Sequence, residues 1–193
     1  TVCEYDVTPT VAIDYDVKVK YNPGDRLVLQ ARQASGLPFE TAGPVRLSWS
    51  LTDAASTPIP ITAPGFLRAP AGSNLVLNPS VLSAGGCYAF QASAVAVATG
   101  ATAFASVDLC MNSPPASGTL TVSPQAGAAI STEFTLRAAG WWDDDTPLRY
   151  MFGFELHGHS TSLAFTSARV MATVLPPGDQ YPLTLQVHDV YAA

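Results

Sequence analysis

The sequence contains little charge and almost no lysine. Charged residues make up 12% of the 193 residues, and the lysines are Lys18 and Lys20. Nine basic residues stand against 15 acidic ones, which gives a formal net charge of -6. Nucleic-acid binding needs a surface that neutralises phosphates, so this composition argues against a nucleic-acid partner.

Long apolar runs are also lacking. The longest, around residues 88–98, is interrupted by Gln91 and Ser93 and falls short of the roughly 18 apolar residues that cross a bilayer. Hydrophobic residues nevertheless make up 48% of the sequence. Because that proportion can bury enough surface for a packed core, the low charge does not indicate disorder.

Helical periodicity is missing as well. No stretch of ten or more residues repeats apolar positions at intervals of three and four, and 16 prolines interrupt the chain. Alternation of period two is present instead, and it predicts half-buried strands. The strand segments are Val11–Tyr21, Arg26–Arg32, Arg46–Leu51 and Asn74–Leu77, and the proline-rich residues 58–70 are expected to wrap a sheet edge. Short strands separated by turn residues predict an all-β sandwich fold.

An internal repeat sets the number of modules. Residues 44–51 (PVRLSWSL) match residues 147–154 (PLRYMFGF) at one constant offset, with proline, arginine and three apolar positions preserved. Residues 81–90 (VLSAGGCYAF) match residues 174–183 (VLPPGDQYPL) in the same way. Two related modules follow from these matches.

Each module has an immunoglobulin-like layout. Trp49 stands where the buried aromatic of the central strand is expected, and Phe152 is its counterpart in the repeat. Tyr88 and Tyr181 stand where a tyrosine corner would hydrogen-bond its hydroxyl back to the chain. The sequence therefore predicts two tandem antiparallel β-sandwiches with these four residues in their cores.

The boundary between the modules is predicted at a proline-rich linker, Ser113-Pro114-Pro115. The first module is then 1–112 and the second 113–193. No counterpart of the first module's last strand, residues 103–109, follows Val190. We expect a second sandwich that is incomplete at its C-terminal strand, or one that a segment from outside these residues completes.

The three cysteines suggest one disulfide. A hairpin that turns between Ala98 and Thr99 places Cys87 opposite Cys110, where a disulfide is geometrically natural. Two buried free thiols are the alternative. A disulfide would place the protein outside the cytosol. Cys3 would then be unpaired, bond to a cysteine elsewhere, or replace one partner of this pair.

One loop concentrates candidate binding residues. Asp143, Asp144 and Asp145 could hold a hard cation such as calcium through oxygen ligands, although adjacent aspartates more commonly cap turns. Trp141 and Trp142 precede them and could stack on a sugar, anchor a partner, or pack between the two modules. Packing between modules is the favoured interpretation of the pair.

Catalytic patterns are not found. His157 and His159 are expected on one face of a strand, but no third ligand accompanies them as a metal site would require. Neither a nucleophile elbow nor a phosphate-binding loop occurs. The sequence therefore predicts no enzyme activity.

A long motif runs from the linker into the second module. It comprises Asn112-x-Pro114-Pro115-x-x-Gly118, Pro124-x-x-Gly127, Thr132-x-Phe134 and Gly140-Trp141-x-Asp143-x-Asp145-x-Pro147-Leu148-x-Tyr150-x-Phe152. This motif resembles the REJ (receptor for egg jelly) module of polycystin-1-like membrane proteins. Trp49-x-Leu51 and the stretch from Leu75 to Phe90 are also similar to that family.

The resemblance implies fibronectin type III-like sandwiches in the ectodomain of a receptor or channel-associated membrane protein, with no catalytic residues. It implies an extracellular location, including ciliary and gamete surfaces. The implied partners are neighbouring ectodomain modules, a polycystin-2-type channel subunit and an extracellular protein or glycan. The alternatives are a structural or adhesive surface protein that uses the same modules, and a calcium-dependent carbohydrate-binding module built on the tryptophans and aspartates.

Overall fold

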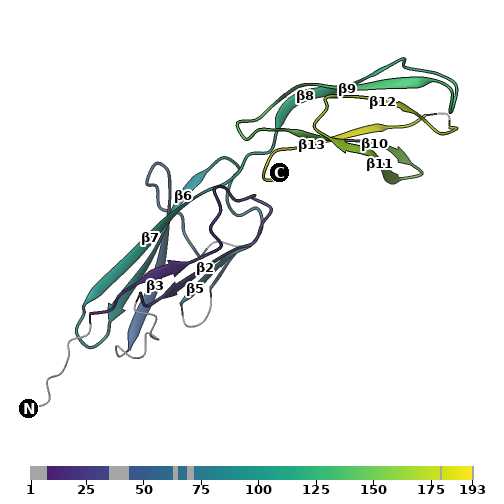
Figure 1. Ribbon diagram of the computed structural model, residues 1–193. Helices are drawn as coiled ribbons and strands as arrows, with labels where there is room; N and C mark the ends of the chain where they lie inside the picture. Colours follow the sequence, from purple (N-terminus) through teal and green to yellow (C-terminus); the bar gives the residue numbers. More distant parts are fainter. Residues whose placement is uncertain (1–7, 35–43, 63–64, 69–71, 179, 193) are drawn as a thin grey trace, which may run out of the picture. The chain divides into compact units, whose positions relative to one another are not determined.

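The structure is a computed structural model that describes residues 8–34, 44–62, 65–68, 72–178 and 180–192. Cys3 lies outside these residues. The chain divides into two compact units, unit 1 (Thr1–Asn112) and unit 2 (Ser113–Ala193). Both are antiparallel β-sandwiches (Figure 1), so the predicted all-β fold class is confirmed. Across the described residues we find no helix with the length and apolar character needed to span a bilayer.

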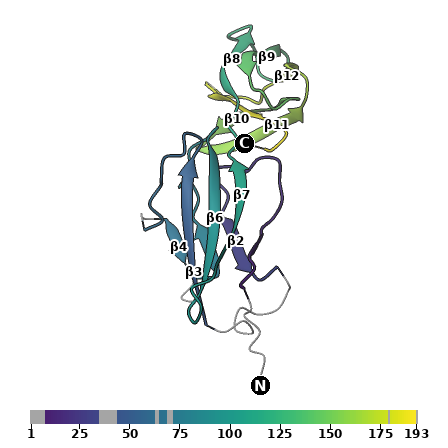
Figure 2. The same ribbon diagram turned by 90° about the vertical axis from the view of Figure 1, so that its left-hand side faces the viewer.

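Unit 1 consists of two facing sheets. One sheet has the order β1-β2-β5-β4, and the other has the order β3-β6-β7, whose strands lie next to one another in Figure 2. The strands are β1 (Ala12–Asp14), β2 (Leu27–Arg32), β3 (Val45–Asp53), β4 (Phe66–Arg68), β5 (Asn74–Leu77), β6 (Cys87–Ala96) and β7 (Thr102–Cys110). β2 and β6 alternate strictly between buried and more exposed side chains, because each has one face on the core.

Unit 2 repeats this arrangement with fewer strands. Its sheets have the orders β12-β9-β8 and β11-β10-β13. The strands are β8 (Ala116–Ser123), β9 (Glu133–Trp142), β10 (Arg149–Leu156), β11 (His159–Thr166), β12 (Val170–Val174) and β13 (Leu183–His188). The repeated segments coincide with β3 and β10, and with the entries into β6 and β13. Each unit has its own hydrophobic core.

The units differ in the strand that follows their central strand. In unit 1, β4 pairs with β5 and joins the sheet of β2, which is the placement of a constant-type immunoglobulin sandwich. In unit 2, β11 pairs with β10 instead, through a tight hairpin. His157 and Gly158 form that turn, and both have positive φ angles, 51° and 79°. The prediction that His157 and His159 share one face of a strand was therefore wrong.

The long strand predicted from Val11 to Tyr21 was also wrong. β1 ends at Asp14, and the side chains of Val17 and Val19 are 76% and 80% exposed. The chain leaves β2 at this point, and Tyr21 makes a parallel bridge to Met111 beyond the end of β7. The alternation persists in the sequence, but between these two pairings no strand holds the segment in register.

The aromatic residues expected in the cores are placed as follows. Trp49 is 6% exposed, and its indole Nε1–H donates to the carbonyl oxygen of Gly72 at 2.9 Å. Phe152 is fully buried in unit 2. The Tyr88 hydroxyl accepts the backbone N–H of Ser83 at 3.0 Å, and the half-buried Tyr181 donates its hydroxyl to a carbonyl oxygen four residues earlier. Both tyrosines thus clamp the loop that leads into their strand.

Candidate functional site

A disulfide joins the two strands that close one edge of unit 1. β6 and β7 pair with Cys87 opposite Cys110, and the two sulfur atoms are bonded. The pairing continues beyond the bridge, where Met111 N–H donates to the carbonyl oxygen of Gly86 at 2.8 Å. The bridge therefore fixes the end of the hairpin from which the chain leaves unit 1.

Three carboxylates converge at one end of unit 2. Oxygen atoms of Asp143, Asp145 and Asp189 all lie within 4.8 Å of one another. Asp143 and Asp145 lie in the loop between β9 and β10, and Asp189 follows β13 directly. These two segments meet because β10 and β13 are neighbours and pair antiparallel, Arg149 opposite His188. Oxygen ligands in such a group suit a hard cation such as calcium.

The cluster differs from the one expected from the sequence. Asp144 is exposed and is not part of it, whereas Asp189 was not anticipated. Two of the carboxylates also stabilise local turns: Asp143 Oδ1 accepts the N–H of Asp145 at 2.6 Å, and Asp189 Oδ1 accepts the N–H of Tyr191 at 2.7 Å. The turn-capping role expected for aspartates in this loop is therefore present beside the convergence. The sequence feature that could have identified Asp189 is its position directly after the last strand of the second module.

The tryptophan pair is divided between the core and the surface. The Trp141 ring packs on the core of unit 2 and covers Gly118, where an added Cβ would lie only 2.4 Å from the ring. Trp142 is 63% exposed. Both tryptophans line a hollow of about 390 Å³ together with Asp143 and Arg169. Trp142 is thus the member of the pair with a large apolar surface open to solvent.

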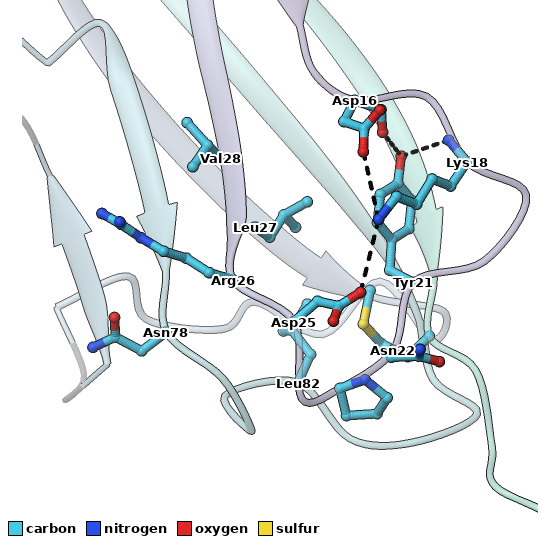
Figure 3. Close-up of a pocket in the computed structure, with 12 residues that line it drawn as sticks. Asp16, Lys18, Tyr21, Asn22, Asp25, Arg26, Leu27, Val28, Asn78 and Leu82 are labelled. Carbon is cyan, nitrogen blue, oxygen red and sulfur yellow. Dashed lines mark hydrogen bonds and ion pairs between the residues drawn. The ribbon is translucent and has the colours of Figure 1, made fainter. Parts of the chain in front are cut away.

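A second hollow lies in unit 1, in the segment that follows β1 (Figure 3). Its volume is about 230 Å³, and Leu82 and Met111 contribute to its apolar lining. Lys18 Nζ stands 3.4 Å from a carboxylate oxygen of Asp16 and 3.7 Å from one of Asp25. The Tyr21 hydroxyl donates to the carbonyl oxygen of Asp16, and burial raises the pKa of Tyr21 above its ordinary value.

The polar groups around this hollow stabilise the local fold. The backbone N–H of Lys18 donates to the Tyr21 hydroxyl at 3.1 Å, so the tyrosine holds the chain that crosses from β1 towards β7. Sequence reasoning did not identify this arrangement, because it interpreted the segment as a strand. Exposed ion pairs of this kind contribute little to stability.

The fold and the sites define a tandem β-sandwich module, with a disulfide across one edge of the first sandwich and an acidic cluster at one end of the second. The chain belongs to the REJ domain family, which matches residues 8–193. This membership supports a polycystin-1-like extracellular module and confirms the resemblance seen in the sequence.

Among solved structures, the chain is similar to the FN1–FN3 domains of chicken CNTN1. The TM-score is 0.43 at 10% sequence identity. The similarity covers 97% of this chain and 63% of that one.

Proposed function

We propose that this chain is a non-catalytic, extracellular part of a polycystin-1-like receptor or channel-associated membrane protein, where it acts as a spacer and an interaction surface in sensing or adhesion, including at cilia. The match to the REJ family over residues 8–193 carries this proposal. The disulfide between Cys87 and Cys110 supports the extracellular location, because such bonds persist in oxidising compartments.

The construction of the units supports the spacer role. Each sandwich buries its own core, so each can transmit position or force without a ligand. The proposed partners are neighbouring ectodomain modules, a polycystin-2-type subunit reached through the parent protein, and an extracellular protein or glycan. Charged residues are few, and those at the surface of unit 1 include local ion pairs such as Lys18 with Asp16, which favours partners that recognise shape and apolar contacts.

An exchange experiment separates the two parts of this proposal. In a polycystin-1-like parent, these residues are replaced by two unrelated fibronectin type III domains of similar total length. Surface delivery and signalling that survive the exchange indicate a spacer, whereas delivery without signalling indicates an interaction surface. If complete deletion of the segment leaves both surface delivery and signalling intact, that result would contradict both roles.

A structural or adhesive surface protein remains the alternative. Binding between cells that carry the chain and cells that lack it would favour this alternative.

A calcium-dependent carbohydrate-binding module is the second alternative. The observations that favour it are the convergence of Asp143, Asp145 and Asp189 within 4.8 Å and the exposed indole of Trp142, the last residue of β9 and the neighbour of Asp143 in the sequence. Calcium that binds only the folded state must raise the melting temperature of unit 2. An unchanged melting temperature at millimolar calcium would exclude this alternative.

A further inference from the structure

One sheet of unit 2 turns a regular set of side chains to solvent. Its strands β8, β9 and β12 lie side by side in Figure 1. Alternate residues of each strand point away from the core, because side chains alternate along a strand. We call this set of exposed residues the β9 face. It consists of Thr121 and Ser123 of β8, Glu133, Thr135 and Arg137 of β9, and Val170, Ala172 and Val174 of β12.

The strand registers arrange the β9 face in rows across the sheet. The pairs between β12 and β9 are Val170 with Arg137, Ala172 with Thr135, and Val174 with Glu133. Ser123 of β8 extends the central row, because it pairs with Thr135 on the other side. A row of small side chains therefore separates two rows that each carry one valine and one charged residue, and the two charges are opposite in sign.

This arrangement is complementary to itself. A two-fold axis along the central row, perpendicular to the strands, places one β9 face on another with the two β9 strands antiparallel. Arg137 then faces Glu133 of the second copy, and Val170 faces Val174 of the second copy. The small residues of the central row face their own equivalents, so the sheets can approach to the roughly 10 Å of aligned sheet packing. A two-fold interface requires self-complementarity of this kind.

The charges and valines of the face are available for such a contact. Among the ion pairs between described residues, none involves Glu133 or Arg137. The two valines, Val170 and Val174, are 48% and 47% exposed. The corresponding sheet of unit 1 differs, because its Arg32 forms an ion pair with Asp14 of the neighbouring strand β1.

The size of the face sets the strength of the contact. Three strands about 4.8 Å apart and five residues with a rise of about 3.4 Å cover a plane of roughly 240 Å². Each partner in a stable complex buries roughly 800 Å² of surface. We therefore expect a weak contact with a dissociation constant of about 0.1–1 mM, which gains strength where several copies are held together.

We propose that two copies of this chain associate weakly through the β9 face of unit 2, with Arg137 of each copy paired to Glu133 of the other and the valines packed across the two-fold axis. Charge complementarity between the two rows of the face carries this proposal. It adds a partner that the proposed function does not include. The two also fail separately, because self-association is measured on the isolated chain, whereas the domain exchange tests the role in the parent protein.

Charge exchange tests the pairing directly. The dissociation constant for self-association of the 193-residue protein is measured by sedimentation equilibrium for the wild type, Glu133→Arg and Arg137→Glu. Each variant places two like charges on the face, so two attractive pairs become two repulsive ones and association should weaken by about tenfold. An equimolar mixture of the two variants should recover the wild-type affinity to within about threefold, because every facing pair is again opposite in charge.

The matched control is Arg46→Glu, which makes the same change of charge at an exposed position of β3 in unit 1. It should leave the dissociation constant unchanged. The protein that combines Glu133→Arg with Arg137→Glu keeps the net charge and should associate like the wild type. A wild type that stays monomeric at about 2 mM would overturn the proposal. So would a mixture that associates no better than its components, or an equal loss of affinity in Arg46→Glu.

Discussion

Removal of the disulfide should destabilise unit 1 and leave unit 2 unchanged. Cys87 and Cys110 are separated by 23 positions in the sequence. A cross-link that closes a loop of that length lowers the entropy of the unfolded chain and stabilises the folded state by about 3.4 kcal/mol in the chain-entropy treatment. Both cysteines are half-buried, so their replacement by alanine removes little packing, and the entropic contribution should dominate.

The expected shift in melting temperature follows from the size of the unit. Unit 1 spans Thr1–Asn112. At about 2.1 cal/mol/K per residue, its entropy of unfolding is roughly 235 cal/mol/K, so a loss of about 3.4 kcal/mol lowers the melting temperature by about 14 °C. The assay is thermal and urea unfolding of the variant that combines Cys87→Ala and Cys110→Ala, followed by tryptophan fluorescence and hydrogen exchange. Trp49 reports on unit 1, and Trp141 and Trp142 report on unit 2.

Two controls accompany this measurement. The wild-type protein in reductant should unfold at the midpoint of the double variant, and the transition of unit 2 should shift by less than about 1 °C because the units have separate cores. A loss below about 1 kcal/mol would refute the reasoning, because it would mean that the unfolded hairpin keeps its ends together without the bond.

Three other substitutions test the contacts described above. Tyr88→Phe removes the hydroxyl that accepts the backbone N–H of Ser83 at 3.0 Å, and should lower the free energy of unfolding in urea by about 1–2 kcal/mol. A loss below about 0.5 kcal/mol would contradict the tyrosine-corner interpretation. Gly118→Ala should lower the free energy of unfolding by more than about 2 kcal/mol, because a Cβ there would lie 2.4 Å from the Trp141 ring. The control is Gly100→Ala, which has a similar φ and open space around it and should lower that free energy by only about 1–2 kcal/mol; equal losses would refute the clash. Asp189→Asn keeps a turn acceptor but removes one of three charges that lie within 4.8 Å of one another. It should raise the stability of unit 2 in chelator by about 0.9 kcal/mol for each repulsive pair removed, the energy of two unit charges 4.8 Å apart in water; a decrease would show that the cluster does not repel.

Much of the fold could be predicted because its elements depend on local pattern. The alternation in residues 26–32, 46–51 and 74–77 coincides with β2, β3 and β5 to within a few residues, since a strand with one buried face must alternate. The opposite positions of Cys87 and Cys110 follow from a hairpin whose turn is local. The repeat identified equivalent strands because related modules keep the same inward positions.

The predictions from the sequence were wrong where the pairing between strands, and not the local alternation of apolar residues, decides the structure. The alternation of residues 11–21 was as regular as that of any strand, yet the chain crosses between sheets after Asp14 and leaves Val17 exposed. The sheet joined by β4 in unit 1 differs from that joined by β11 in unit 2, and no local signal distinguishes them. Intrinsic strand preference describes a fit to a half-buried surface, so it does not select the partner strand.

The candidate site was predictable only in part. The loop with Asp143 and Asp145 was found, because acidic residues beside tryptophans are visible in the sequence. Asp189 lies more than 40 positions away and joins them only because β13 pairs with β10. Local sequence also could not show that Trp141 packs inward on Gly118 while Trp142 stays exposed.

The sequence by itself determined the class of fold, the two modules, the disulfide hairpin and the family, because each rests on periodicity, repetition or a contiguous motif. Tertiary structure alone decided which carboxylates converge and which tryptophan is exposed. These features depend on which strands become neighbours, and that choice is made by the burial of whole sheet faces against each other rather than by the residues of one segment.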